Sequence, residues 1–557
     1  MRANFLLDYD VLTVDRPQKL YLMARFEAGK GLDDKIRRPL NLSLVIDRSG
    51  SMAGDKIDYT RQAAQFLVQH LGANDTLSIV LYNDKVETLL APEVVSNKDS
   101  VSQLLERIRV RGTTNLSGGW LEGCRHVKQS LSSKAMNRVL LMSDGLANRG
   151  VTDQAQLVSM AKQKRNEGVT TTTMGLGKDF NEDLMMEMAN AGGGAFYFIE
   201  SPEVTPTIFQ EELSGLLSVV GQNLSITIET TDAVRALRQL NAYSVNIDPP
   251  ATTFQLGDIF AHEVKTLVLE LAIPALEKTG QTDIAILRFE YDEIEGDKTT
   301  HHIDEFPVSV NIIEPEDVNP SANEDVQASV LLLQAANARR EAVNAADRGL
   351  YDRASSVLRE AAQSISDSQI LSSELQEEEL ALREQADKLE KGASSYDQYS
   401  RKTMSTQALY TMTNRHDDTM MLRRRENERD GKTNTAEERV ITSEQQIPTT
   451  TGDHTAIPPQ KGVPPTHFTY KDKVYALDSD LMRIGRASQN EIVIDEKGVS
   501  RFHAEIRKNG DKVLIEDLDS TNGSTIDGKP LKDSYELSIG DVVFVCDEKL
   551  VFHSQTD

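Results

Sequence analysis

Oxygen-bearing side chains alternate along a short segment that directly follows an apolar run. Residues 42–46 predict a buried strand, and Asp47, Ser49 and Ser51 follow it at every second position. Gly50 allows the backbone to turn sharply between the two serines. One carboxylate and two hydroxyls are hard oxygen ligands, and Mg2+ takes few of these from a protein while it keeps several waters. The segment therefore predicts part of a magnesium site, although Asp and Ser before a helix are also ordinary N-caps.

Two further segments carry oxygen ligands near the same predicted edge of a sheet. Thr114 lies in the segment 111–115, and Asp144 follows the strand predicted over 138–142. Open α/β sheets bind ligands beyond the carboxyl ends of their strands. We therefore expect Thr114 and Asp144 to supply the two further oxygens that the ion needs.

A second set of side chains, near the C-terminus, suits a phosphate group. Arg486 offers the planar fork of a guanidinium, and Ser500 offers a short hydroxyl donor. Both lie in loops of a predicted β-sandwich, where they can converge on one dianion. Asn522 stands before Gly523 in a turn and can reach the backbone of a bound peptide.

The elements that position the first set alternate between short apolar strands and helices. This pattern over 39–215 predicts a parallel, doubly wound α/β sheet. Strand patterns over 1–38 and 216–315 flank it, and chain order suggests one β-sandwich that carries the α/β domain as an insertion. Residues 323–425 form a predicted helical segment, in which the periodicity over 323–392 indicates two or three helices packed as a hairpin.

The C-terminal part divides into a linker and a small domain. Residues 426–466 are polar, contain two Pro-Pro pairs and predict a disordered linker, whereas 467–557 predict an all-β sandwich. A tether of this length gives a local concentration of roughly millimolar order. One hypothesis is that a kinase phosphorylates a threonine here and the C-terminal domain folds back on it; an ordinary polar linker is the alternative. The candidate threonines are Thr419, Thr449, Thr450, Thr451 and Thr455.

The first constellation resembles the von Willebrand factor A (VWA) domain over roughly residues 40–215. The Asp-x-Ser-x-Ser loop, the threonine loop and the strand ending in Ser143-Asp144-Gly145 together resemble the family's metal-ion-dependent adhesion site (MIDAS). The family often has Gly-Gly-Thr in the second loop. This chain has Thr113 in the middle, and Thr114 is the expected ligand.

That resemblance implies a role for each metal-site residue. Ser49, Ser51 and Thr114 would bind Mg2+, while Asp47 and Asp144 would hold coordinated waters or hydrogen-bond the ligating hydroxyls. An open position on the metal would accept an acidic side chain from a partner. Because few of the ligands carry charge, the ion would remain electrophilic. An incoming carboxylate would therefore bind it strongly.

The second constellation resembles the forkhead-associated (FHA) domain over about residues 473–553. Gly-Arg, Ser-x-x-His and Thr-Asn-Gly stand in the family's order. The resemblance implies that Arg486 and Ser500 hold the phosphate of phosphothreonine, that Asn522 bonds the peptide main chain, and that three further residues have structural roles. Those residues are Gly485, His503, which would brace the Ser500 loop, and Gly523. Further contacts to the phosphate or the peptide are expected from Arg501 and Thr521.

Composition excludes several classes of function. The net charge of −26 opposes binding of a polyanion such as nucleic acid. No apolar run approaches the roughly 18 to 20 residues that span a bilayer. Asp8 and Asp10 stand where a signal peptide would need an apolar run. The two cysteines, Cys124 and Cys546, indicate no disulfide framework, so we expect a cytoplasmic protein.

These patterns favour a non-catalytic adaptor in Ser/Thr phosphorylation signalling, of bacterial type and downstream of a Ser/Thr kinase. No phosphate-binding loop of the Gly-x-x-x-x-Gly-Lys-Ser/Thr type and no Gly-x-Ser-x-Gly elbow occurs, and no base or nucleophile stands beside Asp47. The alternative function is an accessory subunit of an AAA+ ATPase or chelatase-like remodelling complex.

Overall fold

The protein, described here by a computed structural model, divides into two compact units, Met1–Thr419 and Met420–Asp557. Within the described part of the chain, no helix is both long enough and apolar enough to cross a bilayer. The structure describes all residues except 30–37, 145–147, 202–203, 296–297, 315–321, 369, 371, 416–417, 420–421, 424–465, 472, 478–480, 487–489, 495–498, 501–502, 510–511, 519, 521–522, 527–528, 532–533, 538–540, 547 and 555–557. The predicted linker therefore lies, all but Thr466, outside the described residues.

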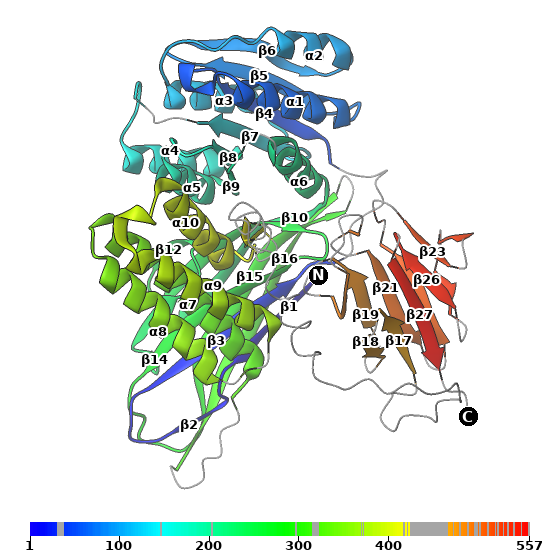
Figure 1. Ribbon diagram of the computed structural model, residues 1–557. Coiled ribbons are helices and arrows are strands. Elements are labelled where there is room, and N and C mark those ends of the chain that lie inside the picture. Colours follow the sequence, from blue (N-terminus) through cyan, green and yellow to red (C-terminus); the bar gives the residue numbers. More distant parts are fainter. Residues whose placement is uncertain are drawn as a thin grey trace, which may run out of the picture. The chain divides into compact units, whose positions relative to one another are not determined.

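The first unit contains a β-sandwich whose strands come from two distant parts of the chain (Figure 1). One sheet has the order β1-β3-β14-β11 and the other β12-β13-β10-β15-β16-β2. Apolar side chains of both sheets meet in one core. The strands are β1 (Arg2–Leu7), β2 (Val11–Thr13), β3 (Gln18–Glu27), β10 (Val219–Thr230), β11 (Ala236–Gln239), β12 (Ser244–Asp248), β13 (Ala251–Phe260), β14 (Val264–Ile273), β15 (Gly280–Glu295) and β16 (Lys298–Ile313).

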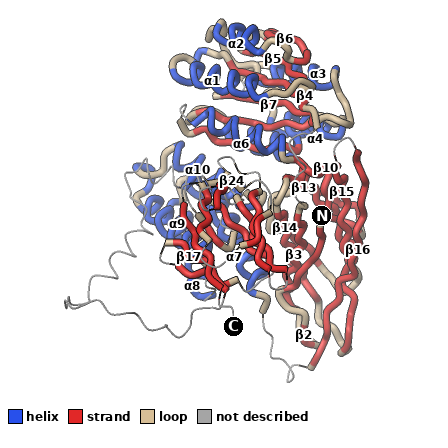
Figure 2. The backbone as a smooth tube through the Cα atoms, turned by 90° about the vertical axis from the view of Figure 1, so that its right-hand side faces the viewer, coloured by secondary structure: helices blue, strands red, loops and turns tan. Residues whose placement is uncertain are grey.

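An α/β domain lies between β3 and β10 in the chain. Its sheet has the order β6-β5-β4-β7-β8-β9, and helices cover both faces (Figure 2). The apolar sides of α1, α2 and α6 share one core with the sheet. The elements are β4 (Leu40–Asp47), α1 (Asp55–His70), β5 (Thr76–Tyr82), β6 (Val86–Val94), α2 (Lys98–Glu106), α3 (Leu116–Gln129), β7 (Met136–Ser143), α4 (Gln154–Asn166), β8 (Thr170–Leu176), α5 (Glu182–Gly192), β9 (Gly193–Ile199) and α6 (Thr205–Leu217).

The doubly wound sheet is confirmed, with one strand and one helix that the sequence pattern did not predict. β6 is antiparallel to β5 and is the edge strand of the sheet. Most of its side chains are exposed, so it has neither the apolar run of a buried strand nor clean alternation. The other missed element is α6, which begins at Thr205 and contains Gly215 near its end, and a glycine inside a helix weakens a helical pattern.

A buried arginine connects the α/β domain to the sandwich. Arg138, near the start of β7, is 2% exposed. Its guanidinium forms ion pairs with Glu212 of α6, at 3.2 Å, and with Asp258 of β13. A buried charge needs partners of opposite sign, so both carboxylates compensate the desolvation of Arg138. This junction lies at the amino end of the parallel strands, whereas Asp47 and Asp144 lie at their carboxyl ends.

In the described residues after β16, the first unit has four long helices, one more than the periodicity predicts. They are α7 (Glu324–Asp347), α8 (Tyr351–Ser368), α9 (Ser373–Glu390) and α10 (Gln398–Met412). The first three form the expected antiparallel packing, with neighbours in contact along the chain. The fourth buries mainly polar side chains, including Lys402, Thr406 and Gln407, so its sequence has no apolar period to detect.

The polar buried face of α10 packs against the α/β domain. Lys402 Nζ donates to the carbonyl of Phe180 at 2.7 Å and pairs with Glu182 at the start of α5. Just beyond the helix, Arg415 donates to the carbonyl of Phe196 at 2.5 Å in β9. Because β9 is an edge strand, this bond satisfies a carbonyl that would otherwise face outward.

The second unit is a sandwich of two sheets with its own apolar core. The sheet orders are β18-β17-β27-β26-β23-β24 and β20-β19-β21-β22-β25. This confirms the predicted all-β architecture. The strands are β17 (Thr466–Tyr470), β18 (Lys473–Ala476), β19 (Leu481–Gly485), β20 (Ile492–Val493), β21 (Ala504–Asn509), β22 (Lys512–Asp517), β23 (Ser524–Ile526), β24 (Lys529–Pro530), β25 (Tyr535–Glu536), β26 (Val542–Val545) and β27 (Glu548–Ser554).

A buried carboxyl in the first sandwich predicts a measurable dependence of stability on pH. Burial raises the pKa of Asp8 to about 6, although Asp8 accepts bonds from the amides of Tyr9 and Tyr21. The pKa of this carboxyl is higher in the folded protein than in the unfolded chain, where it is roughly 4. Its contribution to the free energy of unfolding is therefore fully present below that value and is lost as pH rises through about 6. Asp8→Asn keeps the accepting oxygen without the charge. It should therefore raise the free energy of unfolding at pH 7.5 by about 1–2 kcal/mol.

Urea unfolding of both proteins between pH 4 and pH 8 measures this difference, which should vanish near pH 4. Asp10→Asn, at an exposed position, is the matched control and should change nothing. A gain from Asp8→Asn that is equal at every pH would contradict the assignment to ionisation.

Candidate functional site

The loop after β4 is organised by the carboxylate of Asp47. All eight residues of β4 are buried, and the strand ends at Asp47, which is 0% exposed. One carboxylate oxygen accepts the amide of Ser49 at 2.8 Å, and the other accepts the hydroxyl of Ser143 at 3.0 Å. Asp47 therefore holds its own loop and the end of the adjacent strand β7 in one arrangement.

A chain of hydrogen bonds joins Ser49, Ser51 and Asp144. The hydroxyls of Ser49 and Ser51 are 3.0 Å apart, and Ser51 Oγ donates to Asp144 Oδ1 at 2.7 Å. Ser49 and Asp144 are buried, while Ser51 is exposed. The structure therefore brings four of the five predicted metal-site residues into mutual hydrogen-bonding contact, with Ser51 facing solvent.

The loop that carries Thr114 is tied to the Asp47 loop through backbone bonds. The amide of Gly50 donates to the carbonyl of Gly112 at 3.1 Å, and the amide of Arg111 donates to the carbonyl of Arg48 at 2.8 Å. Gly112 has φ +77, and a Cβ there would lie 2.2 Å from an oxygen of the Asp84 carboxylate. Only glycine fits this crossing of the two loops.

Thr114 itself is held by a residue that the sequence patterns did not single out. Its amide donates to Asn148 Oδ1 at 3.1 Å, and the amide of Asn148 donates to its carbonyl at 3.2 Å. Thr114 is buried, and the neighbouring Thr113 is exposed. Asn148 and Ser143 are thus positioning residues. Ser143 belongs to the Ser-Asp-Gly motif, whereas Asn148 stands at no spacing that sequence alone marks as functional.

The electrostatics of this edge disfavour its negative charge. Burial raises the pKa of Asp47 to about 6, and the nearby charge of Asp144 acts in the same direction. Bonds from Ser49 and Ser143 oppose the rise, but burial has the larger effect. Two carboxylates at a buried edge are stabilised by a cation between or beside them.

The donor set suits a hard divalent cation. The hydroxyls of Ser49, Ser51 and Ser143 lie with the carboxylates of Asp47 and Asp144 in one bonded cluster, whereas calcium cages usually carry more carboxylates. Among the described residues, no group of three or more His, Cys, Asp or Glu side chains could hold a metal ion. Any metal at this edge would thus rely on hydroxyl oxygens, as Mg2+ does with few protein ligands.

In the second unit, Arg486 and Ser500 lie on adjacent loops. The amide of Arg486 donates to the carbonyl of Ser500 at 2.9 Å, and Gly485 before it is buried. The Arg486 side chain is half-buried, and its Nε has no hydrogen-bond partner within the described chain. A half-buried guanidinium with an unsatisfied donor is the group that an anion would complete.

His503 ties these loops together in the way that its resemblance implies. It is 0% exposed; its Nδ1 accepts the amide of Ser500 at 3.0 Å, and its Nε2 lies 3.2 Å from the carbonyl of Gly523. Since Nδ1 accepts, Nε2 carries the proton and donates. Burial lowers the pKa of His503, which favours this neutral form. Three predicted residues of this site, Arg501, Thr521 and Asn522, lie outside the described part of the chain.

The proposed phosphoacceptor Thr419 is placed poorly for a kinase. It is 3% exposed, and its hydroxyl donates to the carbonyl of Arg415 at 3.2 Å. A kinase needs an accessible hydroxyl, so the hypothesis is wrong for Thr419 in this conformation. The other four candidate threonines lie outside the described residues.

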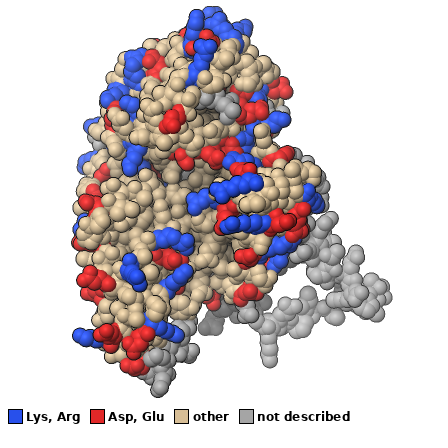
Figure 3. Space-filling model, turned by 90° about the vertical axis from the view of Figure 1, so that its left-hand side faces the viewer, with Lys and Arg blue, Asp and Glu red and all other residues tan. Residues whose placement is uncertain are grey.

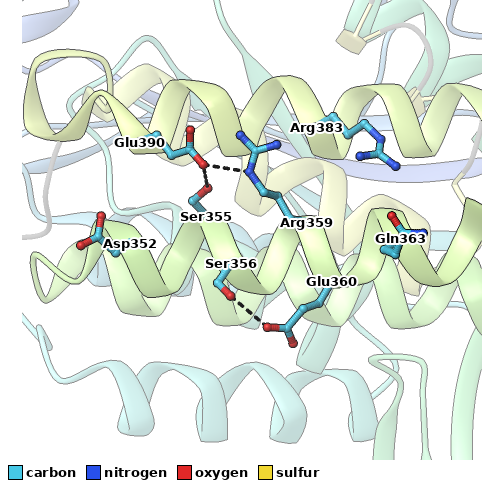
Figure 4. Close-up of a pocket in the computed structure, with 8 residues that line it drawn as sticks. All are labelled: Asp352, Ser355, Ser356, Arg359, Glu360, Gln363, Arg383 and Glu390. Carbon is cyan, nitrogen blue, oxygen red and sulfur yellow. Dashed lines mark hydrogen bonds and ion pairs between the residues drawn. The ribbon is translucent and has the colours of Figure 1, made fainter.

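A hollow between α8 and α9 does not extend these sites (Figure 4). The Ser355 hydroxyl and Arg359 Nε both donate to the Glu390 carboxylate, at 3.0 and 2.8 Å. Most of its polar groups are hydrogen-bonded within the two helices, since Ser356 donates to Glu360, Gln363 donates to Asp367 and Arg383 donates to Glu379. The lining residues are Asp352, Ser355, Ser356, Arg359, Glu360, Gln363, Arg383 and Glu390.

Comparisons with known proteins place both constellations in families. Residues 41–211 match the von Willebrand factor type A domain, and residues 482–545 match the FHA domain. The curated relatives include uncharacterized protein sll0103 of Synechocystis, 24% identical over 316 residues, which are 55% of this chain and 74% of that protein. Uncharacterized protein YfbK of Escherichia coli is 28% identical over 42% of each chain.

A solved structure shares the fold of more than the α/β domain. The von Willebrand factor type A protein from Catenulispora acidiphila matches with a TM-score of 0.55 and 15% identity, over 73% of this chain and 96% of that one. This span exceeds residues 41–211, so the likeness of fold extends to elements outside the α/β domain. The pair of domain families supports a role in protein interaction and signalling.

His503 provides a test of how the second site is built. His503→Ala removes the acceptor of the Ser500 amide and the donor to Gly523, so we expect the second unit to lose about 2–4 kcal/mol of stability. Acid should act in the same direction, because a lowered folded pKa means that stability is lost as pH falls below about 6.5. Hydrogen exchange of the full chain should show faster exchange in peptides around Ser500. The first unit serves as internal control, and unchanged exchange at Ser500 would contradict the bracing role.

Proposed function

We propose that this chain, which carries a VWA domain and an FHA domain, is a non-catalytic adaptor in Ser/Thr phosphorylation signalling. The FHA domain would dock a phosphothreonine-containing protein, and the VWA domain would hold a second partner through Mg2+ and an acidic side chain. The observation that carries the proposal is the half-buried Arg486, whose Nε has no hydrogen-bond partner within the described chain and whose backbone amide bonds the carbonyl of Ser500. A bacterial protein of the cytoplasm, downstream of a Ser/Thr kinase, fits this role.

The FHA half of the proposal follows from donor geometry. A phosphate dianion accepts strong, charge-assisted bonds from a guanidinium and a hydroxyl. The hydrogen bond from the amide of Arg486 to the carbonyl of Ser500 keeps the two loops adjacent. The hydrogen bonds of His503 hold the Ser500 loop to the loop of Gly523. The donors are therefore positioned before a peptide arrives, which lowers the entropic cost of binding.

The VWA half follows from the oxygen cluster at the carboxyl edge of the sheet. Ser49, Ser51 and Thr114 would bind Mg2+, with Asp47 and Asp144 orienting the hydroxyls or bound waters. The bound ion would supply an electrophilic position for a partner's carboxylate. Asp47 orients Ser49 and Ser143, and the exposure of Ser51 leaves the edge open to a macromolecular partner.

Nucleic acid is not among the partners proposed. The chain carries a net charge of −26, which repels a polyanion. On the face drawn in Figure 3, basic and acidic side chains are interspersed over the described surface. This mixture fits protein partners that are recognised by a few specific contacts.

Phosphopeptide binding tests the FHA half directly. A library of phosphothreonine, phosphoserine and unphosphorylated peptides is presented to the full chain, and the best peptide is titrated by fluorescence anisotropy. We expect phosphothreonine to be preferred, and Arg486→Ala to weaken binding about 100-fold or more, because it removes a charge-assisted contact. Arg507→Ala, an arginine paired with Glu505 on β21, is the matched control and should bind like wild type. Equal binding by Arg486→Ala and wild type would contradict the proposed site.

Metal titration tests the VWA half. Calorimetry of Mg2+ with the full chain should show one site, and Asp47→Ala should weaken it by about tenfold or more because the loop loses its central acceptor. Asp179→Ala removes an exposed carboxylate in the loop after β8 and controls for loss of charge alone. If both variants weakened Mg2+ binding equally, the effect would be one of surface electrostatics, and the proposed metal site would be contradicted.

Affinity capture with the two variants then assigns partners to the domains. Partners lost only with Arg486→Ala would be those of phosphorylation signalling. Partners lost only with Asp47→Ala, an ATPase among them, would favour the accessory-subunit function and contradict the adaptor role.

A further inference from the structure

A lysine that the proposed metal chemistry does not use contacts the metal-site edge. Lys56 lies in the first turn of α1, and its Nζ is 2.6 Å from Asp144 Oδ2. Asp144 is 0% exposed, whereas the Lys56 side chain is 23% exposed. The other oxygen of Asp144 accepts the Ser51 hydroxyl at 2.7 Å. One carboxylate is thus shared between a predicted metal ligand and a fixed ammonium group.

The Lys56 side chain lies beside the loop after β8. Gly177 has φ +77, and a Cβ at this position would lie 3.5 Å from Lys56 Cε and 3.6 Å from its Nζ. The amide of Gly177 donates to the carbonyl of Ile199 at 2.8 Å, which fixes the loop to β9. The absence of a side chain at Gly177 leaves room for Lys56, and the contact with Asp144 places the ammonium at the edge of the oxygen cluster.

The charges at this edge do not cancel once a dication is present. Asp47 and Asp144 supply two negative charges, which a divalent ion neutralises. Lys56 adds one positive charge in direct contact with Asp144. With the metal bound, this edge would therefore carry a net positive charge. Without the metal, it would carry less negative charge than the two carboxylates alone would give.

We propose that Lys56 is a specificity-determining residue that lowers the affinity of the edge for the metal and raises the affinity of the metal-loaded edge for a carboxylate. The proposal rests on the metal site proposed above. Like charges separated by a few ångströms in a partly buried place repel strongly, so the ammonium opposes a dication that shares Asp144. The same ammonium attracts an anionic side chain that approaches the loaded site. Lys56 thus biases the domain toward binding the metal and the acidic partner together.

This arrangement distinguishes a charge effect from simple support of Asp144. If Lys56 only held Asp144 in place, its removal would weaken the metal and the carboxylate together. If its charge acts as proposed, removal strengthens one and weakens the other. The two affinities therefore have to be measured separately.

The test compares the full chain with Lys56→Met, Lys56→Gln and a control. Mn2+ alone is titrated by electron paramagnetic resonance of the free ion. Acetate is then added to the Mn2+-saturated protein, and its binding is followed by the water proton relaxation rate, which falls as a carboxylate displaces metal-bound water. Lys178→Met removes an exposed lysine of the loop after β8 and is the matched control. Thermal unfolding with and without Mn2+ shows whether each variant folds.

Both Lys56 variants should bind Mn2+ about tenfold or more tightly than wild type and bind acetate several-fold more weakly at saturating Mn2+. Lys178→Met should match wild type in both measurements. A variant whose metal-free form is destabilised should gain more thermal stability from Mn2+ than wild type does.

Unchanged or weaker Mn2+ binding by both Lys56 variants, with wild type binding normally, would overturn this inference and leave the metal site intact. A parallel fall of both affinities would assign Lys56 to support of Asp144 and overturn it as well. Absence of Mn2+ and Mg2+ binding by wild type would overturn the proposed metal site, and this inference with it.

Discussion

Two carboxylates buried at the carboxyl ends of adjacent parallel strands are the constraint around which the first unit is built. Asp47 ends β4, Asp144 directly follows β7, and both are 0% exposed. Buried charges of one sign are costly unless donors and cations surround them. The structure supplies the Ser49 amide, the hydroxyls of Ser143 and Ser51, and the ammonium of Lys56. The same groups that stabilise the carboxylates also define the place that a divalent ion would occupy.

The remainder of the first unit holds this edge from a distance. Arg138, buried at the opposite end of β7, joins the α/β domain to the sandwich through Glu212 and Asp258. On the β9 side, Lys402 and Arg415 connect the α10 region to the domain through Glu182 and the carbonyl of Phe196. These contacts are buried or partly buried, so each charged group depends on its partners for compensation. The insertion is thus fixed both to the sandwich and to the helices.

Local patterns in the sequence predict much of this architecture, and tertiary contacts account for what they miss. Alternating strands and helices predict the doubly wound sheet, and the side chains at strand ends predict that Asp47, Ser49, Ser51 and Asp144 converge. Lys56 was missed because a single lysine in a first helical turn is indistinguishable from a solvated one. α10 was missed because its buried face is polar, and β6 because an exposed edge strand has no apolar period. In the second unit, the resemblance to the FHA domain implied the bracing role of His503, and the hydrogen bonds of its ring fit that role.

Diffraction at the manganese absorption edge from crystals of the full chain grown with Mn2+ tests the central claim most directly. The account predicts one anomalous peak in this unit, about 2.0–2.3 Å from hydroxyl oxygens of the Ser49, Ser51 and Thr114 set, with Asp47 and Asp144 around it. Anomalous density at some other carboxylate cluster, with none between these loops, would contradict it.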